Sequence, residues 1–145
     1  MLVGPVAGDN RTMSQEDVQA VTRMFDAFNR GDFEAALALL HEDVIWQDPP
    51  DAPDGNGPYR GHDAVSAEFA RFLSAWESLR MELEEVIDAG HCVVVVTRWV
   101  GRGRDSGVPV DRRTAQLYEF HDGRVVRLRQ FAEREDALLA AGLAG

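Results

Sequence analysis

The chain has 145 residues, of which 45% are hydrophobic, and this suits one ordinary globular domain with a single core. Its formal net charge of −10 argues against a nucleic-acid-binding protein, because contacts to phosphates need a basic surface. No apolar run approaches the roughly 20 residues that span a bilayer, and the single cysteine, Cys92, excludes an internal disulfide framework and suits a reducing cytoplasm.

Residues 1–13 are predicted to form a flexible tail ahead of a single domain that spans residues 14–145. The tail has no basic start and no long apolar centre, so it lacks the features of a signal peptide. Met13 is a second candidate for the first residue of the protein. Without a secretion signal, the expected location is the cytoplasm, and no membrane contact is expected.

Two helices and a strand are predicted to follow the tail. Ser14 caps a first helix, whose apolar residues recur at helical spacing until Gly31 ends it. Asp32 caps a second, shorter helix that runs through Leu40. A half-buried strand is predicted at 44–48, and the loop after it is rich in proline and glycine.

A third helix and a series of strands are predicted for the rest of the chain. Turn residues such as Asp122-Gly123 separate the strands, which is typical of hairpins. Helices followed by strands predict an α+β fold, with the helices on one face of an antiparallel sheet. The predicted ranges are a helix at 63–77, strands at roughly 79–88, 91–103, 109–121 and 124–132, and a closing helix at about 134–141.

The strand at 44–48 carries a charged residue where an apolar one is expected. Side chains alternate between the two faces of a strand, so Val44, Trp46 and Asp48 share one face. A buried carboxylate is costly unless it is paired, hydrogen-bonded or neutralised. Either the strand ends at Asp48, or this carboxylate sits in an apolar cavity because a function requires it there.

The strand at 91–103 is apolar on both faces. Val93 and Val95 lie on one face, and Val94 and Val96 lie on the other. One face can pack on the helices, and the other needs a different cover. Because large exposed apolar patches usually mark interfaces, the pattern predicts a homodimer that forms through the sheet.

Four local sequences resemble the nuclear transport factor 2-like superfamily, and in particular its SnoaL-like and ketosteroid isomerase-like branches. The resemblance implies a cone-shaped, curved antiparallel sheet wrapped around three N-terminal helices, the cystatin-like fold, with an apolar pocket inside. It also implies homodimers and a small hydrophobic molecule as the partner. The sequences are F-N-R-G-D-F-E-A-A at 28–36, V-I-W-Q-D-P at 44–49, Y-R-G-H-D-A-V at 59–65, and H-D-G-R-V-V at 121–126 followed by R-L-R-Q-F.

The resemblance implies a catalytic role for Asp48. In ketosteroid isomerases the catalytic base is an aspartate just before a proline at the end of the first strand, and Asp48-Pro49 is similar to that dipeptide. The enolate-stabilising groups differ, because Met24 aligns with the family's tyrosine and Gln116 with its second acid. The resemblance therefore favours a different isomerase, cyclase or lyase reaction over steroid isomerisation.

Other side chains are candidates for binding the substrate. A glutamine on an otherwise apolar strand face needs a hydrogen-bonding partner, which is either a neighbouring side chain or a ligand. The aromatic residues are candidates for the pocket wall, although such spacing is also typical of a plain core. Arg98 is placed inward, as a partner for Asp48 or for an acidic ligand. The substrate-binding candidates are Trp46, Tyr59, Phe69, Arg98, Gln116, Tyr118 and Gln130.

Neither a metal nor another cofactor is expected. The 4 histidines are scattered, without the spacing that places two ligands on one face. The glycines at 101–107 do not have the spacing of a dinucleotide-binding loop. Two functions remain open: a cofactor-independent acid–base enzyme that acts on a small cyclic hydrophobic metabolite, or a non-catalytic, dimeric module that binds such a molecule.

Overall fold

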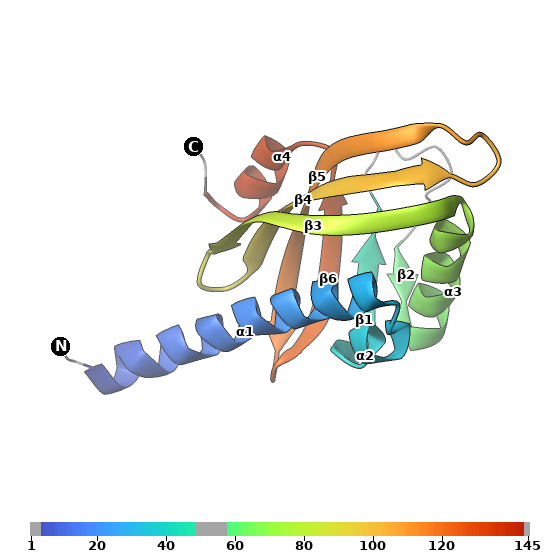
Figure 1. The fold of residues 1–145 in the computed structure, drawn as a ribbon. Coiled ribbons are helices and arrows are strands. Elements are labelled where there is room, and N and C mark those ends of the chain that lie inside the picture. The colour runs from blue at the N-terminus through green and yellow to red at the C-terminus, as the bar shows by residue number, and fades with distance from the viewer. Residues whose placement is uncertain (1–3, 49–57, 144–145) are drawn as a thin grey trace.

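The computed structural model describes residues 4–48 and 58–143, and within these ranges it describes side chains from residue 15 onward. An open, curved, 6-stranded sheet carries the N-terminal helices on one face and a C-terminal helix on the other, which confirms the predicted α+β class (Figure 1). The helices are α1 (Gly4–Arg30), α2 (Phe33–Leu37), α3 (Gly61–Ser74) and α4 (Arg134–Ala140). The strands are β1 (Leu40–Gln47), β2 (Tyr59–Arg60), β3 (Trp76–Asp88), β4 (Val93–Gly103), β5 (Pro109–His121) and β6 (Arg124–Phe131).

The strand order across the sheet is β2-β1-β6-β5-β4-β3. Hairpins connect β3 to β4, β4 to β5 and β5 to β6, and each of these pairs is antiparallel. β1 and β6 are parallel, so the prediction of a wholly antiparallel sheet is wrong at this pair. A tight hairpin forces its two strands to be antiparallel. No hairpin joins β1 to β6, because β2, α3 and the strands β3 to β5 lie between them in the chain.

The first helix begins at Gly4 rather than at the predicted cap Ser14. Pro5 falls in the first turn, where its missing N–H interrupts no helical hydrogen bond. No further proline occurs before the helix ends. The sequence signal at Ser14 therefore marks a favourable turn within a longer helix, and helix replaces part of the tail predicted at 1–13.

The start of the second helix follows the prediction, and its end does not. Gly31 ends α1 with a positive φ of 81°, and the Asp32 carboxylate accepts a hydrogen bond of 3.1 Å from the backbone N–H of Ala35. α2 stops at Leu37, and β1 begins at Leu40 rather than at the predicted residue 44. Pairing of Leu40 with Val125 of β6 therefore places in the strand the last residue of the predicted helix, and β1 also includes residues 41–43, which were predicted in no element.

The two faces of the sheet pack against different helices. On the inner face, Val93 and Val95 join the core formed with the N-terminal helices. On the outer face, Val94 and Leu117 are buried in a second cluster that includes Ala137 of α4. Much of the outer apolar surface is thus covered within the chain, which removes one reason for the predicted homodimer. The homodimer stays a prediction.

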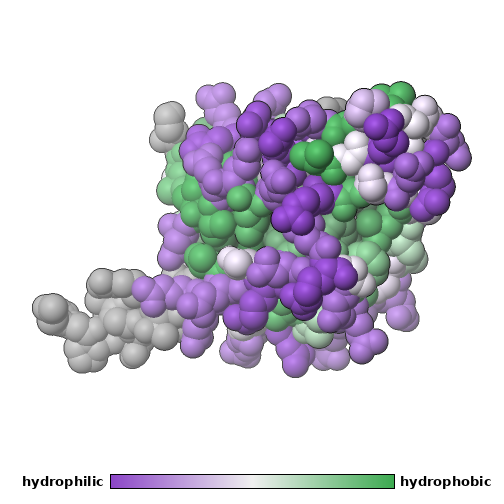
Figure 2. Space-filling view, in the orientation of Figure 1, coloured by the Kyte–Doolittle hydropathy of each residue, from purple (hydrophilic) through white to green (hydrophobic). Residues whose placement is uncertain are grey.

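Hydrophilic and hydrophobic residues are unevenly distributed over the surface of the protein. On the face shown in Figure 2, hydrophilic residues cover α1 from residue 15 onward, and hydrophobic residues are visible above it, over the sheet. Among the described residues, no helix is long and apolar enough to cross a membrane.

Candidate functional site

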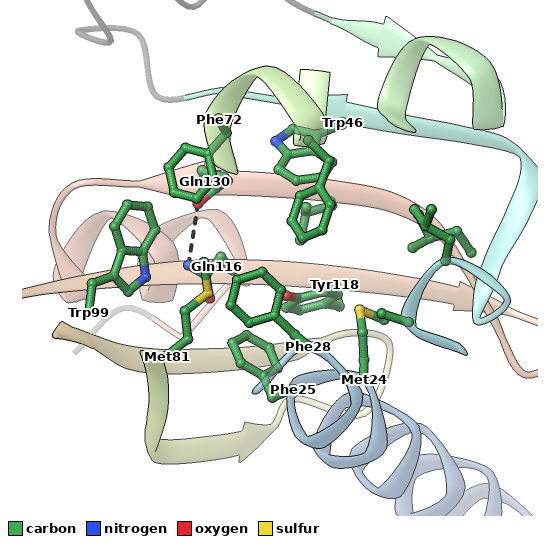
Figure 3. Close-up of a pocket in the computed structure, with 15 residues that line it drawn as sticks. Met24, Phe25, Phe28, Trp46, Phe72, Met81, Trp99, Gln116, Tyr118 and Gln130 are labelled. Carbon is green, nitrogen blue, oxygen red and sulfur yellow. Dashed lines mark hydrogen bonds between the residues drawn. The ribbon is translucent and has the colours of Figure 1, made fainter. Parts of the chain in front are cut away.

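A cavity of about 80 Å³ lies between the three N-terminal helices and the inner face of the sheet (Figure 3). Its wall is largely apolar and rich in aromatic rings, and its polar groups are the amides of two glutamines, the Tyr118 hydroxyl and two indole N–H groups. A cavity of this composition is typical of a small-molecule site. The lining residues are Met24, Phe25, Phe28, Ala36, Leu37, Leu40, Trp46, Phe69, Phe72, Met81, Trp99, Gln116, Tyr118, Leu128 and Gln130.

The volume of the cavity limits what can enter it without rearrangement. An engineered apolar cavity of about 150 Å³ holds benzene, whereas this cavity measures about 80 Å³. Binding of even one ring therefore requires the lining side chains to move apart. Met24 and Met81 are unbranched and flexible, which suits such repacking.

Helix α1 and the edge strand β3 position one part of the wall. The Asn29 side chain donates a hydrogen bond of 2.8 Å to the Met81 carbonyl and accepts one of 3.0 Å from the Met81 N–H. Because β3 is the last strand of the sheet, these backbone groups have no strand partner on that side. Asn29 thus fixes the position of the Met81 backbone relative to α1, and with it the place where the Met81 side chain enters the cavity.

Ring contacts hold the aromatic part of the wall. Phe69 of α3 lies 5.8 Å from Trp46 and 5.4 Å from Phe28, measured between ring centroids. Phe72, one turn further along α3, lies 5.3 Å from Trp99 of β4 in an edge-to-face arrangement. These two residues, three positions apart on α3, therefore connect the helix to β1 and to β4 on the inner face of the sheet.

A buried polar network crosses the inner face of β4, β5 and β6. Two cross-strand pairs build it, Thr97 opposite Thr114 and Gln116 opposite Gln130. The two threonine hydroxyls are 3.0 Å apart, and the indole N–H of Trp99 donates to the Thr97 hydroxyl at 3.1 Å. The side-chain amide of Gln116 connects this pair to Gln130.

One atom of this network has no partner. The Gln116 side chain lies on the cavity wall and is only 3% exposed. Its Nε2 donates to Thr114 Oγ1 at 3.2 Å and to Gln130 Oε1 at 3.3 Å, and it lies 3.4 Å from Thr97 Oγ1. Its Oε1 is buried and accepts no hydrogen bond from the part of the chain that the structure describes. A buried carbonyl without a hydrogen bond is costly, so a donor on a molecule in the cavity would stabilise this atom.

Asp48 lies directly after the last residue of β1 and is half-buried. Burial raises the pKa of its carboxyl group above 3.8, and the nearby Glu68 carboxylate raises it further. A hydrogen bond from Tyr59, the Trp46 indole and the Arg71 guanidinium lower this pKa by smaller amounts. The indole N–H of Trp46 is close enough to act on the charge, yet it completes no hydrogen bond with any described acceptor.

Glu68 and Arg71 form an ion pair beside Asp48. Glu68 is 9% exposed, and its two carboxylate oxygens accept hydrogen bonds of 2.8 and 2.6 Å from the Arg71 guanidinium. Both residues lie on α3, three positions apart, so the helix itself sets their geometry. The bidentate contact compensates the burial of the Glu68 charge.

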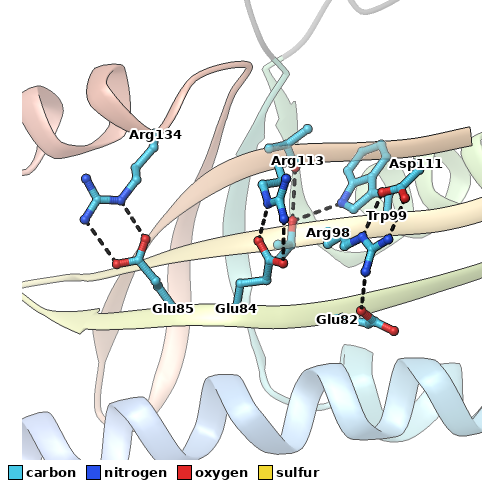
Figure 4. Close-up of polar contacts among 10 residues, drawn as sticks. Glu82, Glu84, Glu85, Arg98, Trp99, Asp111, Arg113 and Arg134 are labelled. Atoms are coloured by element: carbon cyan, nitrogen blue, oxygen red, sulfur yellow. Dashed lines mark hydrogen bonds and ion pairs between the residues drawn. The ribbon is translucent and has the colours of Figure 1, made fainter.

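The inward placement of Arg98 is wrong. Trp99 lines the cavity, so Arg98, its neighbour in β4, points to the outer face (Figure 4). Its guanidinium donates to the Asp111 carboxylate at 2.8 Å and lies 3.8 Å from Glu82. The sequence left this open because both faces of β4 are apolar at residues 93–96. Arg98 pairs with neither Asp48 nor a cavity ligand.

The structure brings together most of the predicted substrate-binding residues. Trp46, Phe69, Gln116, Tyr118 and Gln130 all line the cavity. Tyr59 is paired with Trp46 between β2 and β1 and contacts Asp48 instead. Asp48 is outside the set of described residues that line the cavity, so the structure places it beside the cavity rather than at its floor.

Sequence reasoning missed several residues of the site. Trp99 and Met81 were not proposed, because the inward placement of Arg98 put its neighbour Trp99 on the outer face. The Glu68–Arg71 pair was also missed, since an acidic and a basic residue at this spacing are common on exposed helix faces. No group of three or more His, Cys, Asp or Glu side chains that could hold a metal ion occurs among the described residues.

Comparison with known proteins places this site within a family. A family model described as a SnoaL-like domain matches residues 21–128, which include the greater part of the cavity wall. No curated protein matches the sequence.

Solved structures share the fold. A nuclear transport factor 2-like protein of unknown function from Burkholderia pseudomallei has a TM-score of 0.74 and 24% identity, covering 86% of this chain and 95% of that one. A putative SnoaL-like polyketide cyclase from Jannaschia has a TM-score of 0.72 and 23% identity, covering 90% and 94%. A Mycobacterium tuberculosis protein in complex with estradiol-17β-hemisuccinate has a TM-score of 0.68 and 22% identity, covering 81% and 94%.

Proposed function

The chain belongs to the SnoaL-like domain family, and on this premise we propose that its cavity binds a small, largely apolar ring compound. The observation that carries the proposal is the cavity wall, in which aromatic and aliphatic side chains from helices and sheet surround two amides. Such a wall favours flat apolar molecules with few polar groups. A similar fold in complex with estradiol-17β-hemisuccinate supports a ligand of this chemical type.

The size of the cavity narrows the proposal to compact ligands. One ring is the largest unit that modest side-chain repacking accommodates. A steroid-sized ligand requires larger movements of the lining side chains than a single ring does. We therefore expect single-ring compounds to bind more readily than polycyclic ones.

The binding proposal is tested by a substitution that fills the cavity. Ala36 is buried and lines the cavity, so Ala36→Leu is expected to weaken the binding of toluene and p-cresol by about tenfold or more. Ala38→Leu makes the same exchange at an exposed position of the same segment and is expected to leave both affinities unchanged. Isothermal titration calorimetry measures the affinities. Equal binding by the natural protein and Ala36→Leu would place the ligand elsewhere.

A second candidate function is acid–base catalysis by Asp48 on the bound molecule, of the isomerase, cyclase or lyase type. The observation that favours it is the raised pKa of this carboxyl group, caused by burial and by Glu68, since a base is more effective when its pKa lies nearer to the working pH. Steroid isomerisation remains unfavourable, because the two positions that align with the family's enolate-stabilising groups, Met24 and the Gln116 carbonyl, offer no hydrogen-bond donor.

The pKa of Asp48 is expected to depend on Glu68. Glu68→Gln removes a neighbouring negative charge and should lower the Asp48 pKa, whereas Glu77→Gln, at an exposed position of β3, should not change it. Titration of the Asp48 carboxyl carbon by NMR measures the pKa in both variants.

The stability of the protein is expected to depend on the charge of Asp48. Because the folded-state pKa lies above 3.8, ionisation of Asp48 lowers the free energy of unfolding as pH rises through that pKa. Asp48→Asn should therefore stabilise the protein at neutral pH and lose this advantage in acid; the opposite trend would contradict the raised pKa.

A further inference from the structure

We infer that the wall formed by β5 and β6 is an acceptor subsite, which selects ligands that carry a hydroxyl or N–H group able to donate a hydrogen bond to Gln116 Oε1. This inference rests on the proposed function of the cavity as a ligand site, and it specifies the chemical class of the ligand.

The hydrogen bonds of Gln116 leave only its carbonyl for a ligand. A side-chain amide has two N–H hydrogens and one carbonyl oxygen. Thr114 and Gln130 accept from Nε2 at 3.2 and 3.3 Å, and Thr97 lies at 3.4 Å, so protein acceptors surround the nitrogen. The amide cannot donate to a ligand without breaking one of these bonds. What it offers to the cavity is an acceptor.

Gln130 Oε1 can only accept, so it is the neighbour that requires the Gln116 Nε2 on its side of the amide. The indole N–H of Trp99 can only donate, and it does so to Thr97 Oγ1 at 3.1 Å. The hydroxyls of Thr97 and Thr114 bond to each other at 3.0 Å. Both hydroxyls are buried, at 0% and 7% exposure, so the network does not exchange its partners with bulk solvent.

The unpaired carbonyl of Gln116 favours the binding of ligands with a hydrogen-bond donor over ligands without one. The other polar groups of the described wall are Gln130, whose Oε1 already accepts from Gln116, the Tyr118 hydroxyl, and the indole N–H groups of Trp46 and Trp99. A ligand that brings no donor leaves Gln116 Oε1 without a hydrogen bond, so it gains less affinity than a ligand that donates to this oxygen. A phenol, an alcohol or an N–H compound supplies the missing hydrogen. A group that develops negative charge is repelled by the same oxygen.

Matched single-ring ligands test the inference. Phenol, toluene and anisole have similar size, and only phenol carries a donor. NMR titration of the natural protein and of Gln116→Met is expected to show that the substitution weakens phenol by about tenfold relative to toluene, because methionine fills the space without an acceptor. Anisole is expected to follow toluene. The control is Gln47→Met, which makes the same exchange in β1, next to Trp46 and on the opposite face of that strand. It should leave the ratio of phenol to toluene affinities unchanged.

Each outcome decides the inference. Toluene binding together with a phenol-to-toluene ratio that is the same in the natural protein and Gln116→Met would overturn the acceptor subsite and leave the proposed function standing. Binding of none of the three ligands would overturn both. If Gln116→Met does not fold, the natural protein still decides, since tighter binding of anisole than of phenol contradicts an acceptor at this wall.

Discussion

Replacing Gly101 by alanine is expected to destabilise the protein by about 2–4 kcal/mol. Gly101 of β4 is opposite Leu79 of β3, next to a register shift between Trp76 and Ser78. An added Cβ would overlap the Ser78 carbonyl oxygen and press on Leu79 Cα at 3.0 Å, both of which are backbone atoms. This cost exceeds the roughly 0.5–1 kcal/mol by which alanine is favoured over glycine within a strand.

Gly103 provides the matched control on the same strand. A Cβ there would meet the Ser106 Oγ at 2.7 Å, which is the end of a side chain that can rotate away. Gly103→Ala is therefore expected to change the free energy of unfolding by only about 0.5 kcal/mol. Urea unfolding measures both variants. Equal stability of the two would mean that β3 does not approach β4 this closely at Gly101.

Phe25→Ala is expected to destabilise the protein by about 3–5 kcal/mol. Phe25 of α1 is 6% exposed, and its ring meets the Tyr118 ring edge to face, with the centroids 6.3 Å apart. Because Phe25 also lines the cavity, its truncation enlarges the space available to a ligand. A ring compound such as p-cresol should bind the enlarged cavity and restore part of the lost stability.

Phe33 gives a control in which the same atoms are removed nearer the surface. It is 38% exposed and lies outside the described cavity wall, although its ring contacts Phe28 and Phe69. Phe33→Ala is expected to cost about 1–2 kcal/mol, with little additional recovery on adding p-cresol. Urea unfolding with and without p-cresol checks both variants. Equal recovery in the two would argue against a ligand in the Phe25 cavity.

Element order and strand alternation predicted the class of the fold and much of the cavity wall. Alternation placed Gln116 and Tyr118 on one face of β5, and both line the cavity. The same rule failed for Arg98, because valines occupy both faces of β4 and only the helices decide which face is inside. The parallel pairing of β1 with β6 was also beyond local reasoning, since a long connection fixes no strand direction.

The sequence pattern around Asp48 predicted only part of the environment of this carboxylate. Of the two alternatives for Asp48, the structure follows the first, because β1 ends at Gln47 and Asp48 is not among the described residues that line the cavity. Burial nevertheless raises the pKa of its carboxyl group. Its main neighbour, Glu68, comes from α3, and no sequence pattern connects the two residues. The unpaired oxygen of Gln116 was equally hidden, because it depends on which of its partners accept from the amide nitrogen.

The most direct test of the cavity as the ligand site is an NMR measurement of contacts between p-cresol and the methyl groups of the protein. Met24 and Met81 line opposite parts of the cavity wall, on α1 and β3, whereas Leu139 is 56% exposed on α4. If the cavity is the ligand site, we expect nuclear Overhauser effects from the p-cresol ring to the Met24 and Met81 methyls, and none to the Leu139 methyls. Contacts to Leu139 in the absence of any to Met24 and Met81 would contradict a ligand site in the cavity.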